Sequence, residues 1–244
     1  MKVLLVSLLS AALFAAAGAR ADEQTIRQVV AAKLRDAKIL EIRKLGYAGL
    51  YEVTVQRPEG FTVLYTDESA SVILAGSLID TRTDRNLTEE RLRKLSAIDW
   101  NTLPFKWALT MKRGDGRRQI AIFSDPNCPY CRRFEADLAK LDDITVHIFL
   151  YPVIKPESVV QTKAVWCSRD RVKAWNDLML RGVQPTAKPD CETPIEALVA
   201  LGQRLGASAT PTWFLRNGEK RSGAMTMTDL VPLLDATAPT RSSK

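Results

Sequence analysis

Two cysteines separated by two residues carry the clearest chemical signal in this sequence, in the segment Cys128-Pro129-Tyr130-Cys131. The apolar run 120–123 before them predicts a buried strand, and the amphipathic spacing after them predicts a helix. Cys128 would then lie at a helix N-terminus, where unpaired N–H groups and the helix dipole stabilise a thiolate. Pro129 suits the first helical turn. The segment predicts thiol–disulfide exchange, in which Cys128 attacks a disulfide and Cys131 or a substrate thiol resolves the mixed disulfide.

Other uses of a CxxC pair stay open at this point. A zinc site would need two further ligands, and the sequence offers His147 as its only histidine and Cys167 and Cys191 as its other cysteines. A structural disulfide within the pair is a second alternative. Haem attachment is excluded because Arg132 occupies the position where that motif needs histidine. We expect no metal and no other cofactor, and we give His147 a structural role.

Cys167 and Cys191 are interpreted as a structural disulfide, with a second redox pair as the alternative. Closing the loop between them would stabilise the fold by roughly 3–3.5 kcal/mol through the entropy of the unfolded chain. Thr210-Pro211 precedes a predicted strand, 212–216, and by itself predicts an ordinary trans proline. A cis bond packed beside the CxxC pair would instead let the Thr210 backbone bind an extended substrate as an added strand.

Residues 1–21 predict a signal peptide. Lys2 precedes the apolar run 3–17, and Ala19-Arg20-Ala21 has the small-x-small pattern of a cleavage site. The run is short for a membrane span, although an uncleaved anchor is the alternative. Export also suits the four cysteines, because disulfides persist outside the cytoplasm.

The mature chain predicts two modules joined by a helix. Residues 22–84 combine one helix, 22–37, with short alternating strands, and this α+β module has so few large apolar residues that we expect its sheet to pair with another surface. A capping box at Asn86 starts a charged linker helix, assigned to 85–104.

The second module, 105–238, has the strand–helix–strand order of an α/β domain, and a polar tail, 239–244, follows it. Residues 100–118 predict a connector, and helices are predicted over 159–180, 194–205 and 228–234. The net charge of +7 is spread along the chain in a way that indicates a solvated cationic surface and no nucleic-acid partner.

The run 122–131 resembles the active-site segment of the periplasmic disulfide isomerases DsbC and DsbG, and the resemblance covers the whole mature chain. Val165-Trp166-Cys167-Ser168 and Asp190-Cys191 are similar to the structural disulfide of DsbC, and Ala209-Thr210-Pro211 is similar to the cis-proline loop of the family. Segment 153–158 and the Pro-Tyr dipeptide are more DsbG-like, whereas the second cysteine pair favours DsbC.

The resemblance implies a cystatin-like α+β dimerisation module, the linker helix, and a thioredoxin-like α/β domain with a helical insertion. It implies a homodimer whose two CxxC sites face a shared apolar cleft. Ile122 stands where thioredoxin carries a buried aspartate, so that aid to proton transfer is expected to be absent. The roles that it implies are Cys128 as nucleophile, Cys131 as resolving cysteine, Pro129, Tyr130, Thr210 and cis-Pro211 as substrate-binding residues, and Cys167–Cys191 as a structural disulfide.

The predicted function is that of a periplasmic disulfide isomerase and reductase acting on misfolded, disulfide-containing exported proteins. The resemblance implies that a membrane reductase of the DsbD type keeps its cysteines reduced. The alternatives are DsbG-like reduction of sulfenic acids with chaperone activity, a holdase without redox chemistry, and a monomeric oxidase resembling DsbA. The N-terminal module argues against the oxidase.

Overall fold

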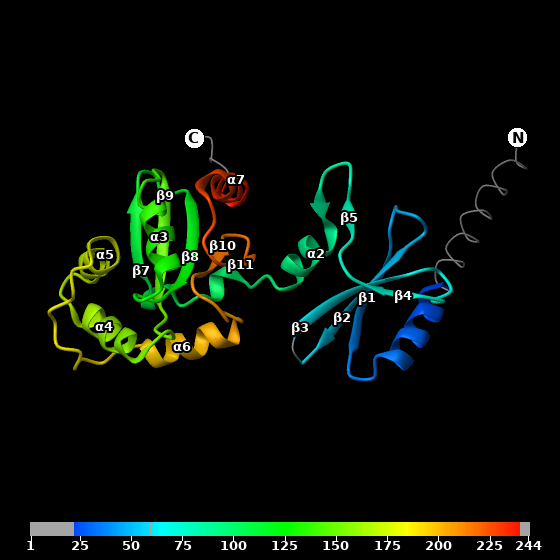
Figure 1. Ribbon diagram of the computed structural model, residues 1–244, viewed down its shortest axis with the longest axis horizontal. Helices are drawn as coiled ribbons and strands as arrows, with labels where there is room; N and C mark the ends of the chain where they lie inside the picture. Colours follow the sequence, from blue (N-terminus) through cyan, green and yellow to red (C-terminus); the bar gives the residue numbers. More distant parts are fainter. Residues whose placement is uncertain (1–21, 59, 240–244) are drawn as a thin grey trace, which may run out of the picture. The chain divides into compact units, whose positions relative to one another are not determined.

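The computed structural model describes residues 22–58 and 60–239 (Figure 1). The predicted signal peptide, 1–21, lies outside the described residues, as do Glu59 and the tail residues 240–244. The chain divides into two compact units, Met1–Ser96 and Ala97–Lys244. None of the helices in the described part of the chain is long and apolar enough to cross a membrane.

The first unit combines a helix, 22–33, with a four-stranded antiparallel sheet in the order β1-β2-β3-β4. The strands are β1 (Lys38–Lys44), β2 (Tyr51–Arg57), β3 (Gly60–Thr66) and β4 (Ile73–Ala75). A small hairpin of β5 (Ile79–Asp80) and β6 (Arg85–Asn86) follows. Ile26 and Val30 of the helix pack with Val53 and Val55 of β2 in a core that is almost wholly buried. The helix is shorter than the predicted 22–37, because the chain turns after Lys33 toward β1.

Helix α2 (Leu87–Leu95) begins after Asn86, whose side chain accepts a hydrogen bond from the Glu89 N–H at 3.0 Å. This is the helix end that the capping box predicts. The helix packs on β3, where the Tyr65 hydroxyl and Thr88 Oγ1 lie 2.5 Å apart. It therefore occupies the first part of the segment predicted as a linker, 85–104, and belongs to the first unit.

The second unit is built on a five-stranded sheet in the order β11-β10-β8-β9-β7, in which only β8 and β9 run parallel among the described strands. The strands are β7 (Leu109–Arg113), β8 (Arg118–Ser124), β9 (Ile144–Leu150), β10 (Thr212–Leu215) and β11 (Lys220–Ser222). The connector predicted over 100–118 was wrong in part, because it contains β7. This strand pairs with β9 at the sheet edge, and a short polar edge strand has little signal of its own in the sequence.

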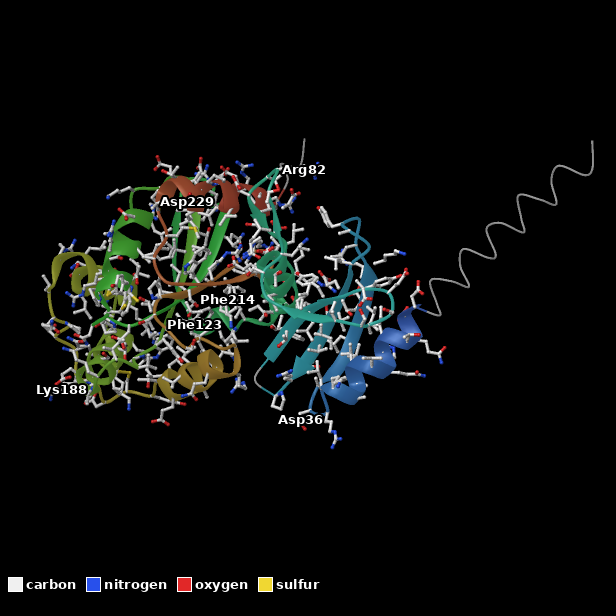
Figure 2. All side chains as sticks on the ribbon, turned by 45° about the vertical axis from the view of Figure 1, so that its right-hand side comes forward. Asp36, Arg82, Phe123, Lys188, Phe214 and Asp229 are labelled. Carbon is white, nitrogen blue, oxygen red and sulfur yellow. A yellow bond between two sulfur atoms is a disulfide. The ribbon has the colours of Figure 1, made fainter. Side chains whose placement is uncertain are left out.

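Five α-helices of the described residues surround this sheet. They are α3 (Pro129–Leu138), α4 (Pro156–Cys167), α5 (Arg171–Arg181), α6 (Ile195–Arg204) and α7 (Met227–Thr237). The helical stretch predicted over 159–180 is divided, since Asp170 caps a new helix by accepting a hydrogen bond from the Lys173 N–H at 2.9 Å. Phe123 and Phe214 meet edge to face in the core, with ring centroids 6.0 Å apart (Figure 2).

Candidate active site

The turn between β8 and α3 is held by one buried carboxylate. Asp125 Oδ1 accepts hydrogen bonds from the Asn127 N–H at 2.7 Å and from the Ser158 hydroxyl at 2.8 Å. Asp125 Oδ2 accepts from the backbone N–H groups of Val153 and Ile154 at 2.7 and 2.9 Å. Because a buried carboxylate needs such partners, these bonds tie the segment before the CxxC pair to the loop that follows β9.

Cys128 occupies the N-cap position of α3. Its sulfur accepts a hydrogen bond from the Cys131 N–H at 3.3 Å, and its thiol donates to the Thr210 carbonyl oxygen at 3.2 Å. The peptide bond between Thr210 and Pro211 is cis. The structure thus brings the N-terminus of the helix and the loop before β10 together at one sulfur atom. A helix N-terminus supplies N–H donors that stabilise a thiolate there.

Cys131 lies behind Cys128 and is completely buried. Both cysteines are free thiols. Burial raises the pKa of the Cys131 thiol far above that of a free cysteine, and the Asp125 backbone and the Ser124 side chain offset this only in part. Cys131 is therefore a protonated thiol at neutral pH, and it must lose its proton before it can act as a nucleophile.

An open groove of about 780 Å³ lies beside Thr210, whose carbonyl oxygen accepts the hydrogen bond from the Cys128 thiol. Tyr130 and Thr210 line it, and the Tyr130 ring is 65% exposed. Segment 223–227, which comprises the β11–α7 connection and the first residue of α7, forms the other wall and includes Met225 and Met227. Pro129 is exposed in the first turn of α3, beside the groove-lining tyrosine. The predicted substrate-binding residues are thus gathered around Cys128.

The second cysteine pair is bonded and lies away from this groove. Cys167 and Cys191 form a disulfide that ties the end of α4 to the segment before α6. Ser158, at the other end of α4, contacts the active-site loop, and the rise of a helix places Cys167 about 14 Å further along. Because Cys167 and Cys191 are bonded to each other, a mixed zinc site with the CxxC pair is not formed.

Glu135 is a buried acid that the sequence interpretation missed. It lies one turn after Cys131 on α3, and its carboxylate accepts hydrogen bonds from the Ser124 hydroxyl at 2.5 Å and the Trp175 indole N–H at 2.7 Å. Burial raises the pKa of Glu135 to about 7. The spacing contained the signal, because Cys131, Phe134, Glu135 and Leu138 share the buried face of α3.

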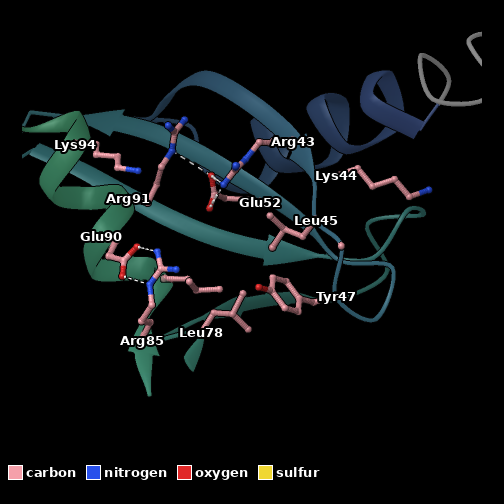
Figure 3. A pocket seen from close by; sticks show the side chains of 12 residues that line it. Arg43, Lys44, Leu45, Tyr47, Glu52, Leu78, Arg85, Glu90, Arg91 and Lys94 are labelled. Atoms are coloured by element: carbon pink, nitrogen blue, oxygen red, sulfur yellow. Dashed lines mark hydrogen bonds and ion pairs between the residues drawn. The ribbon is translucent and has the colours of Figure 1, made fainter. Parts of the chain in front are cut away.

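The first unit has a polar pocket of about 350 Å³ between β1 and α2 (Figure 3). Its arginine and glutamate side chains pair with one another. Arg43 and Arg91 each lie 3.1 Å from the buried carboxylate of Glu52, and Arg85 pairs with Glu90. We therefore interpret this pocket as part of the packing of α2 onto the sheet.

Two family models match the chain. The thioredoxin-like domain matches residues 105–238, and the disulfide bond isomerase protein N-terminal domain matches residues 17–89. The probable thiol:disulfide interchange protein DsbC of Bordetella parapertussis is 37% identical over 205 residues, which cover 84% of this chain and 71% of that protein. The chain belongs to the DsbC family of thiol:disulfide interchange proteins.

Other relatives agree with this assignment. DsbC of Escherichia coli K12 is 29% identical over 89% of both chains, and DsbG of Pseudomonas aeruginosa is 28% identical over 72% of both. The crystal structure of a disulfide interchange protein from Neisseria gonorrhoeae superposes with a TM-score of 0.53 and 34% identity, covering 55% of this chain and 98% of that one. The predicted fold class, the closer resemblance to DsbC and the class of thiol–disulfide oxidoreductase and isomerase are confirmed.

Proposed function

We propose that Cys128 is the nucleophile and Cys131 the resolving cysteine of a disulfide isomerase that rearranges incorrect disulfides in exported proteins. The observation that carries this proposal is the position of the Cys128 sulfur, at a helix N-terminus and in contact with both the Cys131 N–H and the Thr210 carbonyl. The Cys128 thiolate attacks one sulfur of a substrate disulfide, and the other substrate sulfur leaves as a thiolate.

The mixed disulfide then has two outcomes. A second substrate thiolate can attack the substrate sulfur, which forms a new substrate disulfide and releases the Cys128 thiolate, so that isomerisation consumes no reductant. Cys131 can instead attack Cys128, which releases the reduced substrate and leaves a Cys128–Cys131 disulfide. That disulfide must be reduced before the next cycle, and we assign this step to a membrane reductase of the DsbD type.

Substrate binding is assigned to the groove beside Cys128. The exposed rings of Pro129 and Tyr130 and the methionine side chains of segment 223–227 offer apolar contacts that adapt to many sequences. Thr210 and Pro211 come directly before β10, so an extended peptide bound along their backbone would lie next to the Cys128 sulfur.

The cellular setting is also a proposal. We propose export to the periplasm with cleavage near Ala21, which suits an enzyme that handles disulfides. We further propose a homodimer formed through the first unit. Its edge strand β4 is short, and Val72 and Leu74 beside and within it are 54% and 51% exposed, which supports pairing with a second copy.

Reactivation of a ribonuclease with scrambled disulfides tests the proposed function. The pre-reduced mature protein should restore ribonuclease activity, and Cys128→Ser should abolish this. Cys131→Ser should retain part of the isomerisation, because a substrate thiol can still resolve the mixed disulfide. Equal recovery with wild type and Cys128→Ser would contradict the proposal. No recovery with either would favour sulfenic-acid reduction or a holdase role instead.

A further inference from the structure

A chain of hydrogen-bonding groups leads from the Cys131 thiol into the core of the second unit. Ser124, the last residue of β8, has its side chain near the Cys131 thiol, where it lowers the pKa of that thiol, and it donates its hydroxyl to Glu135 Oε1 at 2.5 Å. Trp175 of α5 donates its indole N–H to Glu135 Oε2 at 2.7 Å. The Ser124 and Trp175 side chains come from different elements, so both oxygens of the carboxylate have a fixed partner.

None of the described side chains in contact with the Glu135 carboxylate is a cationic partner for it. The partner on β8 is the hydroxyl of Ser124, and α5 contributes the indole of Trp175 and the side chain of Asn176. Arg113 of β7 lines the same small cavity of about 20 Å³, but its guanidinium donates to the carbonyl oxygens of Leu138 and Leu141. On α3 itself the titratable neighbour is Cys131.

A carboxyl group buried at this position lowers the free energy of unfolding. Glu135 lies on the face of α3 that Phe134 and Leu138 bury, where an apolar residue would avoid the desolvation of an acid. Its two hydrogen bonds hold it against Ser124, toward the active site. A buried acid with a perturbed proton affinity that is connected to a reacting group is a candidate for acid–base chemistry.

We propose that the Glu135 carboxylate accepts, through the Ser124 hydroxyl, the proton that Cys131 loses when it attacks the mixed disulfide. This inference rests on the proposed function of Cys128 and Cys131. In the step, the Cys131 sulfur forms a bond to the Cys128 sulfur while the bond between Cys128 and the substrate sulfur breaks. The Cys131 proton moves to the Ser124 oxygen as the Ser124 proton moves to Glu135. The substrate sulfur leaves with the electron pair and takes a proton from water.

Glu135 would thus supply the carboxyl that we expected to be absent because Ile122 replaces the aspartate of thioredoxin. Ile122 is completely buried on β8, in keeping with an apolar role. The acid reaches Cys131 from its own helix instead of from the strand. Because burial raises the pKa of Glu135 to about 7, the carboxylate form becomes more populated as the pH rises through neutrality. The rate of proton transfer from Cys131 should rise with it.

The test separates the attack by Cys128 from the attack by Cys131. The reduced mature protein is mixed with excess oxidised glutathione, and the reaction is quenched in acid at successive times. The masses of the products are then measured by mass spectrometry. The glutathionylated species reports the first attack, and its conversion to the internal disulfide reports the second. In Glu135→Gln we expect unchanged formation of the mixed disulfide and a conversion about a hundredfold slower at pH 8, the lower end of the usual size of general-base effects. The rise in conversion rate near pH 7 should also disappear.

Ser124→Ala is the second variant, and it keeps the proposal testable if Glu135→Gln does not fold. It should slow the conversion as Glu135→Gln does, and the double variant should be no slower than either single one. Glu135→Asp should restore part of the rate. Glu196→Gln makes the same chemical change on the exposed surface of α6 and should leave both steps unchanged.

Folded Ser124→Ala or Glu135→Gln protein that converts the mixed disulfide at the wild-type rate across pH 6–9 would overturn the inference. A uniform slowing with the pH dependence retained would also overturn it, because that result indicates a structural role. If wild-type protein forms no glutathionylated Cys128, the proposed function fails and not the proton transfer alone.

Discussion

The Cys128 sulfur lies 3.2 Å from the carbonyl oxygen of Thr210, a residue 82 positions further along the chain. The two meet because β8 and β10 are neighbouring strands, with Phe123 opposite Thr212. The segment after β8 and the segment before β10 therefore emerge at the same edge of the sheet. This relationship places a reactive sulfur beside backbone that an extended peptide can pair with.

The two thiols should differ sharply in reactivity. Burial raises the pKa of Cys131, whereas Cys128, which is 2% exposed, lies at the helix N-terminus next to Thr210 of the groove. We expect iodoacetamide at pH 7 to alkylate Cys128 and to leave Cys131 as a thiol until the protein is denatured. Peptide mapping by mass spectrometry measures this. Rapid labelling of Cys131 in folded Cys128→Ser would show that the burial of Cys131 does not protect it.

The disulfide between Cys167 and Cys191 should stabilise the second unit without taking part in the exchange. Its cysteines are separated by 24 positions, and in the chain-entropy model a disulfide that closes a loop of that length stabilises the fold by about 3.5 kcal/mol. We expect the double variant Cys167→Ala, Cys191→Ala to lose about this much free energy of unfolding in urea. Its rate of mixed-disulfide formation at Cys128 should be unchanged under conditions where it is folded, and a large drop would contradict a purely structural role.

Glu135 should make the protein less stable as the pH rises through neutrality. Its pKa is raised from 4.5 to about 7 in the folded state, so the folded protein binds more protons than the unfolded chain between these values. The stability lost by pH 8 is about 3 kcal/mol, because a tenfold change in proton affinity equals about 1.4 kcal/mol. Glu135→Gln should therefore gain stability relative to wild type between pH 5 and pH 8, as urea unfolding at both pH values measures. An equal difference at both would show that Glu135 is not protonated at pH 5.

His147 should have the opposite dependence on pH. Burial lowers its pKa from 6.5 to about 4, so the unfolded chain binds the extra proton between these values and stability falls as the pH falls through this range. Its Nδ1 lies 2.9 Å from Thr110 Oγ1, and its ring packs against Phe105 with centroids 4.5 Å apart. The variant His147→Asn can keep a polar contact to Thr110. Its unfolding temperature should fall less from pH 6.5 to pH 4.5 than that of the wild type.

The ion pairs of Glu52 should stabilise the first unit (Figure 3). The Glu52 side chain is 3% exposed and has contacts of 3.1 Å to both Arg43 and Arg91. Arg91→Leu removes one of these partners from a buried charge and should destabilise the unit by about 2 kcal/mol. Arg85→Leu is the matched control, because its partner Glu90 is more exposed and such pairs contribute less than about 1 kcal/mol. Hydrogen-exchange rates of the β2 amides compare the two variants. Equal rates would contradict the larger contribution of the Glu52 ion pairs to stability.

Local patterns were enough to predict the reactive segment and the order of most of the elements. The strand before Cys128, the helix after it and the cap at Asn86 depend on periodicity and on neighbours within a few residues. The assignment of Cys167 and Cys191 to a structural disulfide drew on spacing and composition, and the cis bond at Pro211 came only through the resemblance to a family.

Only the tertiary structure decided the contacts between distant segments. The strand β7 was missed because an edge strand depends on its partner β9 more than on its own residues. The bonds of Asp125 to the loop after β9, and the placing of Ser124 and Trp175 on either side of Glu135, depend on sheet order and helix packing. A sequence shows which side chains can ionise or donate, but the burial that shifts a pKa and the partner that completes a hydrogen bond come from residues far along the chain, which only folding brings together.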